Sequence, residues 1–467
     1  MSYSKNLSVI ILAAGKSKRM KSEISKALHN ICYQPILYYI LSSVNKINPK
    51  NVFVVVGHRS ELIDKYVKSN FPGIKTVYQK KQLGTAHAVL AVKKYRKDLG
   101  EDILVLPGDC PLIASGSLKK LVNRKIKTSN AAVVLTTTAS NPKGYGRIIK
   151  DRKENVLKIV EEADATYAEK QMNEVNSSMY CFDKKILFEN IENIDSKNSQ
   201  KEYYLTDIVE KMVKNGNKVS CLKISNSKEA LGINDRIQLS KVEKVMQMTI
   251  NEKMMQDGVT IKDPGSCYIG GSVKIERDSV IEPFCFIKGK SIIGSNCVIG
   301  PFSQITNTKV GSGSKINSSV IIDAVIGRNN NIGPHSYIRP DTVTGENVKI
   351  GAFCEVKKSK INNRSKVPHL SYVGDTEIGS SVNIGASSVT VNYDGYRKNK
   401  TIIEDNVFIG SDTMLVAPVR VGKGAVVAAG SVITDDVPSN CLAIERGSQK
   451  NIKDGAIRYR KKKEMKE

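Results

Sequence analysis

Short apolar runs alternate with longer mixed segments along the first half of the chain. The runs SVIILAA, NVFVVVG, DILVLPGD and AAVVLTT are rich in Val and Ile, and the stretches between them have helical length. Buried parallel strands have this composition, and crossover helices need this spacing. The pattern predicts an α/β domain with a mostly parallel sheet covered by helices.

A different pattern begins at Asn234. From there to Gln256 the apolar residues recur mostly at steps of three to five, namely at Ile237, Val242, Val245, Met246, Ile250 and Met254. This spacing predicts one amphipathic helix, suited to connecting two domains. We therefore expect a first domain over residues 1–233, a linker helix over 234–260 and a second domain over 261–467.

The second domain shows a six-residue period. Single aliphatic residues, often followed by Gly, recur at this interval at Ile326, Ile332, Ile338, Ile350, Val356, Ile403, Ile409, Leu415, Val421, Val427 and Ile433. Neither a helix nor an ordinary hairpin has this period, whereas each face of a parallel β-helix takes one hexapeptide. The second domain is predicted to be a stack of such coils, each supported by its neighbours.

Two segments interrupt the six-residue period. VNYDGYRKNKTI, between Thr390 and Ile403, must leave the stack as a loop, and NNRSKVPHLSYVG places His369 beside Pro and aromatic residues. Insertions on one face of a repeat array often form a binding site.

Composition narrows the class of protein. A chain of 467 residues is too long for one ordinary core, and its formal net charge of +26 favours polyanionic or phosphorylated ligands over acidic surfaces. The basic run RYRKKKEMKE is expected to be a loose, solvated terminus.

Nine scattered cysteines without a CxxC pair indicate neither a zinc site nor a disulfide framework. No apolar run is long enough for a membrane span or a signal peptide, so we expect a cytoplasmic protein with no membrane or nucleic-acid partner.

Candidate chemistry in the first domain begins with VIILAAGKSKRM. Gly15 allows close approach of backbone to a phosphate, and Lys16, Lys18, Arg19 and Lys26 supply positive charge. The spacing is neither that of a Walker loop nor that of a dinucleotide fingerprint. By itself the stretch fits a plain strand-to-helix turn as well as a phosphate site.

A carboxylate follows another buried strand. In LPGDCPL, Asp109 could bind a divalent metal beside phosphates, although Asp is also common in turns. QKKQLGTAHA offers amide and hydroxyl groups beside Gly84 that suit the reading of a base edge, and NPKGYGRI adds a further Gly turn.

Taken in order, these motifs resemble a known family. LAAGKSKRM, QLGTAHA, the Gly-Asp pair at 108 and 109, GYGRI, EYYLTD and GIN at 232–234, joined to hexapeptides with HLSY and NYDG, are similar to the bifunctional N-acetylglucosamine-1-phosphate uridyltransferases and glucosamine-1-phosphate N-acetyltransferases. The resemblance covers almost the whole chain. It implies a Rossmann-like nucleotidyltransferase domain followed by a left-handed parallel β-helix, a homotrimer, Mg²⁺, and UTP and acetyl-CoA as co-substrates.

The resemblance also implies roles for residues of the first domain. Phosphoryl groups would be met by Arg19 and Lys26, and Mg²⁺ would be held by Asp109 and Asn234. The positions implied for UTP and the sugar nucleotide product are Leu12, Ala13, Ala14, Gly15, Lys26, Gln79, Gly84, Thr85, Gly146, Glu161, Asn176 and Asn234. The implied step is attack by the phosphate of N-acetylglucosamine 1-phosphate on the α-phosphorus of UTP. Because both reacting groups belong to the substrates, the protein needs only to align them and neutralise charge.

In the second domain the implied reaction is acetyl transfer from acetyl-CoA to glucosamine 1-phosphate. An amine must lose a proton before it attacks a thioester, and histidine is the residue type suited to accept it near neutral pH, which favours His369 as the base. The sugar phosphate would be met by Arg339, Lys357, Tyr372 and Asn383, with Lys398 nearby. Acetyl-CoA would be met by Asn392, Tyr393, Ser411, Ala429 and Arg446.

Three departures from the family pattern affect these expectations. Ser17 and Lys18 stand where Gly and Thr are usual, Ser177 and Ser178 replace Thr and Gly, and Ser387 replaces a Gly. We expect substrate affinity to be affected more than the type of reaction.

Two rival functions are considered. In the first, the chain is a sugar-1-phosphate nucleotidyltransferase whose β-helix only assembles subunits, which gives His369, NYDG and Arg446 no role. In the second, it is a non-catalytic scaffold with a basic surface, which leaves Asp109 and the nucleotide motifs unexplained.

Overall fold

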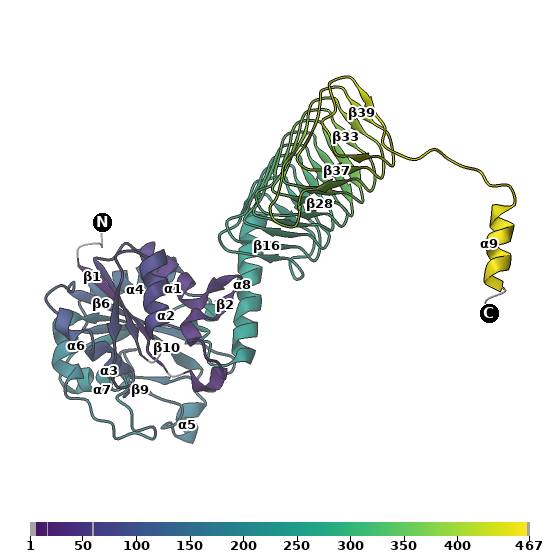
Figure 1. Cartoon of the computed structure of the whole chain (residues 1–467). Coiled ribbons are helices and arrows are strands. Elements are labelled where there is room, and N and C mark those ends of the chain that lie inside the picture. Colours follow the sequence, from purple (N-terminus) through teal and green to yellow (C-terminus); the bar gives the residue numbers. More distant parts are fainter. Residues whose placement is uncertain (1–5, 16, 58–59, 465–467) are drawn as a thin grey trace. The chain divides into compact units, whose positions relative to one another are not determined.

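The computed structural model describes residues 6–15, 17–57 and 60–464, with the side chains of Lys18 and Glu464 outside this description (Figure 1). Two compact units divide the chain, Met1–Gln247 and Met248–Glu467. The helix predicted from Asn234 is α8, Arg236–Gln256, and the division falls within it. Domain boundaries at 233 and 260 stay a prediction.

The first unit is built on a mixed sheet in the order β11-β7-β10-β6-β1-β4-β5, with β8 and β9 as a side hairpin. Its strands are β1 Leu7–Ala13, β4 Asn51–Val56, β5 Lys75–Tyr78, β6 Asp102–Pro107, β7 Ala132–Thr138, β8 Arg147–Lys150, β9 Val156–Val160, β10 Glu174–Asp183 and β11 Val219–Lys223, and a separate pair is β2 Asn30–Ile31 with β3 Gln34–Pro35. The four runs predicted as strands are confirmed as β1, β4, β6 and β7.

One strand departs from the predicted parallel arrangement. β10 runs antiparallel to both β6 and β7, whereas β1, β4, β5 and β6 pair in parallel. Parallel neighbours need a crossover connection. The chain between β7 and β10 instead forms the hairpin β8–β9, so β10 returns in the opposite direction.

Helices cover both faces of this sheet (Figure 1). One face packs against α3 Thr85–Leu90, α6 Lys184–Ile191 and α7 Asp207–Lys214, which share a buried core with alternate strand residues such as Ile10 and Phe53. α4 Ser115–Thr128 packs against β7 and β10, and α1 Ile36–Asn45 contacts α4. The other helices are α2 Ser60–Asn70 and α5 Tyr167–Lys170, with short 3-10 turns η2 Lys18–Met20, η3 Lys26–Leu28, η4 Lys93–Tyr95 and η5 Ser227–Ala230.

The second unit is a three-sided stack of parallel coils (Figure 1). Sheet I contains β12 Thr260–Ile261, β15 Val280–Ile281, β18 Val298–Ile299, β21 Lys315–Ile316, β24 Asn331–Ile332, β27 Lys349–Ala352, β30 Lys366–His369, β33 Asn383–Ile384, β36 Phe408–Ile409, β39 Val426–Val427 and β41 Leu442–Ala443. Sheet II contains β13 Tyr268–Ile269, β16 Phe286–Lys288, β19 Gln304–Thr306, β22 Val320–Ile322, β25 Tyr337–Ile338, β28 Glu355–Lys357, β31 Tyr372–Gly374, β34 Val389–Val391, β37 Met414–Val416 and β40 Val432–Ile433. Sheet III contains β14 Lys274–Ile275, β17 Ile292–Ile293, β20 Lys309–Val310, β23 Val325–Ile326, β26 Val343–Thr344, β29 Lys360–Ile361, β32 Thr376–Ile378, β35 Thr401–Ile403 and β38 Val419–Val421.

The aliphatic residues that recur every six positions form the core of this stack. Every aliphatic residue named for the period is buried, and they belong to one continuous hydrophobic cluster. Between coils they lie in register, as Ile332 beside Ile350 and Ile338 beside Val356 show. Parallel β-helix architecture is thereby confirmed.

Of the two predicted interruptions, only one leaves the stack. β34 and β35 flank the NYDG segment, where Tyr396 is 96% exposed. The segment around His369 stays in the coil, because Ile350 pairs with Val367 and Val356 with Val373. This coil is one residue shorter than its neighbour, which shifts the sequence period without breaking the structure.

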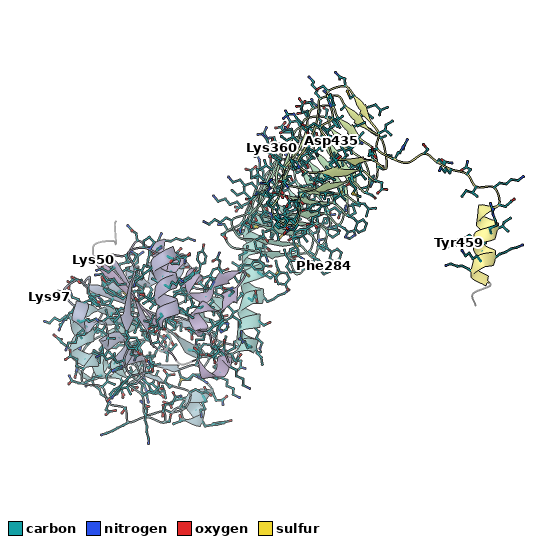
Figure 2. All side chains as sticks on the ribbon, in the orientation of Figure 1. Lys50, Lys97, Phe284, Lys360, Asp435 and Tyr459 are labelled. Carbon is teal, nitrogen blue, oxygen red and sulfur yellow. The ribbon has the colours of Figure 1, made fainter. Side chains whose placement is uncertain are left out.

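The basic end of the chain is exposed, as expected of a solvated terminus, but it is helical. Residues Gly455–Glu464 form helix α9 rather than a loose terminus, because the run from Ala456 contains neither Pro nor Gly. Its described side chains from Ala456 onward, including Tyr459 in Figure 2, are exposed. Among the described residues, none of the helices combines the length and apolar character that a bilayer crossing requires.

Candidate active sites

A cavity of about 930 Å³ opens at the carboxyl ends of β1 and β6 in the first unit. Ligands of open α/β sheets commonly bind at this edge. Every residue predicted for the uridyltransferase reaction lines it: Leu12, Ala13, Ala14, Gly15, Arg19, Lys26, Gln79, Gly84, Thr85, Asp109, Gly146, Glu161, Asn176 and Asn234. Lys16 lies outside the described residues, as does the side chain of Lys18.

Lys26 joins the two residues predicted to hold a metal. Its Nζ lies 2.5 Å from Asp109 Oδ2 and 3.2 Å from Asn234 Oδ1. One carboxylate oxygen and one amide oxygen thus converge on a single cationic centre, and both are ligand types that Mg²⁺ accepts. The donor set fits a magnesium ion that completes its coordination with water and substrate oxygens. Among the described residues there is no cluster of three or more His, Cys, Asp or Glu that would hold a metal alone.

The loop carrying Gly84 is held by a distant segment. Gly84 has φ +121°, and a side chain there would overlap the backbone of Tyr203. Ala86 N–H donates to Tyr203 O at 2.9 Å, and Thr85 Oγ1 accepts from Leu205 N–H at 2.9 Å. EYYLTD therefore shapes the QLGTAHA loop, which explains why both motifs occur together.

A second corner of the cavity brings together Gly146, Glu161 and Asn176. A side chain on Gly146 would lie 3.5 Å from Glu161 Oε2 and 3.6 Å from Asn176 Cβ. Thr206 Oγ1 donates to Glu161 Oε1 at 3.1 Å, while burial raises the pKa of Glu161. Glu161, Asn176 and Thr206 thus form a polar wall of the cavity beside Gly146.

Sequence reasoning missed several residues of this cavity, among them Gln82, Tyr180, Thr206 and Gln238. Gln82 lies in QKKQLGTAHA and Thr206 lies in EYYLTD, so their position inside these motifs could have indicated a place in the site. Tyr180 is one residue of an apolar strand and carried no signal of its own.

In the second unit, five residues predicted or noted for acetyl transfer line up along the corner between sheets I and II. Ser387 N–H donates to His369 O at 3.3 Å, Gly430 N–H to Ser411 O at 2.8 Å, and Arg446 Nη1 to Ala429 O at 2.9 Å. His369 is exposed at the end of β30. Ser387 has φ +58°, a backbone conformation that Gly adopts at lower cost than Ser does.

A cationic group lies at the carboxyl ends of the strands of sheet II, away from the corner with sheet I. Lys398 and burial lower the pKa of Lys357, and Arg339 adds to this effect. A side chain on Gly374 would overlap both the Tyr372 hydroxyl and Asn392 Nδ2, so these two groups lie close together. Tyr372 thus extends along sheet II toward the cations, while Tyr393 is 57% exposed in the NYDG loop.

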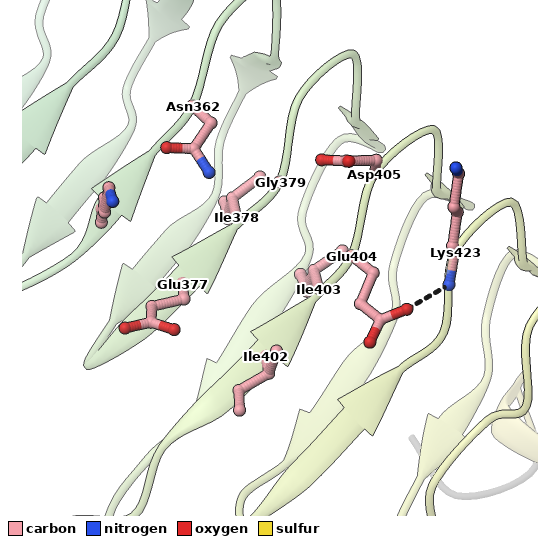
Figure 3. A pocket seen from close by; sticks show the side chains of 10 residues that line it. Asn362, Glu377, Ile378, Gly379, Ile402, Ile403, Glu404, Asp405 and Lys423 are labelled. Atoms are coloured by element: carbon pink, nitrogen blue, oxygen red, sulfur yellow. Dashed lines mark hydrogen bonds between the residues drawn. The ribbon is translucent and has the colours of Figure 1, made fainter.

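Within one chain, none of the described contacts joins Asn383 to the corner residues around His369 or to the cations around Lys357. It lies on sheet I between Lys366 and Phe408. A shallow hollow of about 280 Å³ on sheet III, lined by Glu377, Glu404, Asp405 and Lys423 among others, contains none of the predicted residues (Figure 3). The predicted acetyltransferase residues therefore occupy an exposed corner and sheet rather than this hollow.

Comparisons with known proteins agree with this architecture. Residues 8–228 match the nucleotidyl transferase family, 323–358 the bacterial transferase hexapeptide (six repeats), and 400–435 the hexapeptide repeat of succinyl-transferase. The chain is 45% identical over 445 residues to the Bifunctional protein GlmU of Carboxydothermus hydrogenoformans, covering 95% of this chain and 99% of that one. It is 46% identical over 457 residues to that of Thermoanaerobacter pseudethanolicus, covering 98% and 99%, and 45% identical over 459 residues to that of Clostridioides difficile, with the same coverage. With relatives this similar along almost its full length, and with a nucleotidyltransferase unit joined to a transferase β-helix, the chain belongs to the bifunctional GlmU family.

Proposed function

We propose that the first unit joins UTP and N-acetylglucosamine 1-phosphate to form UDP-N-acetylglucosamine and pyrophosphate. A phosphate oxygen of the sugar attacks the α-phosphorus of UTP, and the bond to the bridging oxygen of pyrophosphate breaks. The observation that carries this proposal is that all residues expected for the reaction line one cavity around the Asp109–Lys26–Asn234 contact.

The residues of the cavity divide the work of binding. Backbone from Leu12 to Gly15 approaches the phosphates, while Arg19 and Lys26 neutralise charge that develops on the leaving pyrophosphate. Gln79, whose Nε2 lies 2.9 Å from His87 Nδ1, and the Gly84–Thr85 backbone read the uracil edge. Gly146, Glu161 and Asn176 orient the sugar.

Asp109 and Asn234 would hold Mg²⁺, which when bound supplies charge neutralisation for the triphosphate. Lys26 now occupies the space between these oxygens and is placed to turn to a phosphate.

In the second unit we propose acetyl transfer from acetyl-CoA to the amino group of glucosamine 1-phosphate. The amine nitrogen attacks the thioester carbonyl, the carbon–sulfur bond breaks, and CoA leaves as the thiol. His369 accepts the proton that the amine loses. Arg339, Lys357, Tyr372 and Asn383 bind the sugar phosphate, and Asn392, Tyr393, Ser411, Ala429 and Arg446 bind acetyl-CoA.

The acetyltransferase residues suit a shared site. His369 and Arg446 lie on an outward corner of one stack, and Asn383 lies on sheet I whereas Lys357 and Tyr372 lie on sheet II. An outward corner encloses a substrate only when another surface faces it, which supports a homotrimer with sites between subunits. Both reactions use cytoplasmic metabolites, and we propose that location.

Replacing the acidic metal ligand tests the first reaction. Asp109→Asn is expected to lower pyrophosphate release from UTP and N-acetylglucosamine 1-phosphate by at least a hundredfold, because the amide cannot neutralise a divalent ion. CoA release from acetyl-CoA and glucosamine 1-phosphate should stay at the wild-type rate. Undiminished pyrophosphate release would contradict the assignment.

A further inference from the structure

Strand β10 is irregular where it faces the cavity. Its pairing with β7 shifts register between Asn176 and Tyr180, and Ser178 within this bulge has φ +60°. Asn176 N–H donates to Gly146 O at 2.9 Å, which anchors the bulge to the Gly turn. Bulges re-aim side chains, and this one turns Asn176 to the cavity.

Two hydrogen bonds fix the orientation of the Asn176 carboxamide. Its Oδ1 accepts from Ser178 N–H at 3.0 Å, and its Nδ2 donates to the Tyr180 hydroxyl at 2.6 Å. A backbone N–H can only donate, so the oxygen must face Ser178 and the nitrogen must face Tyr180. One N–H and one oxygen lone pair are left for a ligand.

Burial makes this orientation costly to change. Asn176 is 3% exposed and Tyr180 is 2% exposed, so water cannot replace the phenol as acceptor. Burial, followed by the nearby Glu161 charge, raises the pKa of Tyr180, which keeps the phenol neutral. The ring itself is packed against Phe182, with centroids 5.4 Å apart, so the hydroxyl is held in place.

We propose that Tyr180 is a positioning residue for the sugar substrate: its hydroxyl holds the Asn176 carboxamide in the orientation that the sugar 1-phosphate meets. The inference rests on the proposed uridylyl transfer. It adds a residue that acts on the sugar through Asn176.

Tyr180→Phe tests the proposal because it keeps the ring packing and removes only the acceptor. Nδ2 of Asn176 is then buried without a partner, and the carboxamide can rotate. In steady-state assays of the full chain we expect KM for N-acetylglucosamine 1-phosphate to rise about tenfold. KM for UTP and kcat should change less than about twofold, because the nucleotide end of the cavity is untouched.

A double-mutant cycle separates positioning from general loosening. In an Asn176→Ala background, Tyr180→Phe should raise KM by less than about twofold, since the group it orients is gone. The matched control is Tyr39→Phe, which removes a tyrosine hydroxyl bonded to Ile31 O at 3.0 Å in the same unit and should leave both KM values unchanged.

The outcomes are distinguishable. If the wild-type chain releases no pyrophosphate from these substrates, the proposed function itself fails. If the wild type is active but Tyr180→Phe leaves the sugar KM unchanged, or raises it equally with and without Asn176, the positioning role is overturned.

Discussion

At the scale of single residues, Lys26 holds Asp109 and Asn234 together through contacts with both side chains. The side chains of Lys26 and Asp109 are 18% and 22% exposed, so an unpaired carboxylate there would lose much of its hydration. The ammonium balances that charge in the free protein. If Asp109 and Asn234 hold Mg²⁺ as proposed, the ion and Lys26 compete for the same oxygens.

This competition predicts a gain in metal binding when the lysine is neutralised. Lys26→Met should bind Mn²⁺ at least about threefold more tightly in the absence of nucleotide, because removing a competing cation favours the metal. Titration followed by electron paramagnetic resonance of free Mn²⁺ measures it. Lys50→Met, which changes an exposed lysine labelled in Figure 2, is the control and should bind as the wild type does. Weaker binding to Lys26→Met would show that the two cations do not share a site.

Asp207 gives a pH-dependent prediction. Burial, then the charges of Glu161, Asp164, Asp195 and Glu210, raise the pKa of Asp207 to about 6. The folded chain therefore binds this proton more tightly than the unfolded chain, and Asp207 ionisation lowers stability as pH rises from about 4 to about 6. Asp207→Asn should become increasingly stabilising, relative to wild type, across that window in urea unfolding at pH 4.5 and 7.0. A stability difference that is constant with pH would contradict the shift.

Motif residues could be predicted from sequence because each serves a backbone or charge requirement that few residue types meet. Gly84 is one, since its φ of +121° and the nearby Tyr203 backbone exclude a side chain. Tyr180 could not be predicted, because its role arises from a hydrogen bond across a bulge in an otherwise apolar strand.

At the scale of elements, the coils were predictable because burial repeats with the coil. The inward residue of most hexapeptides is aliphatic, with Thr344 and Thr390 as exceptions, and the period survives in the sequence wherever the coil length is constant. Coil length varies, however, and a coil one residue shorter near His369 looks like an interruption although β30 and β31 pair normally. The direction of β10 could not be predicted either, because a buried apolar strand has the same hydrophobic pattern in parallel and antiparallel pairing.

The NYDG loop is expected to be dispensable for folding and essential for acetyl transfer. Replacing residues 393–399 by Gly-Ser-Gly should leave the unfolding of the coils nearly unchanged, because these residues are mostly exposed and β34 and β35 keep their neighbours. CoA release should fall at least about fiftyfold, as the loop carries Tyr393 and Lys398. Circular dichroism melting and a thiol assay measure the two effects. Retained CoA release would remove the loop from the site.

At the scale of the whole molecule, the two units carry separate sites whose reactions are consecutive. Acetylation of glucosamine 1-phosphate in the second unit makes the sugar phosphate that the first unit consumes. All residues predicted for uridylyl transfer belong to the first unit, and all residues predicted for acetyl transfer belong to the second. Loss of one activity should therefore leave the other intact.

The most direct test gives the full chain Mg²⁺, acetyl-CoA, glucosamine 1-phosphate and UTP, and follows CoA thiol and pyrophosphate separately for the wild type and His369→Ala. We predict that the wild type releases both, and that His369→Ala loses thiol release by at least about a hundredfold yet makes pyrophosphate at the wild-type rate when supplied with N-acetylglucosamine 1-phosphate. A wild-type chain that never releases thiol would contradict the account, and the β-helix would then serve only to assemble a nucleotidyltransferase.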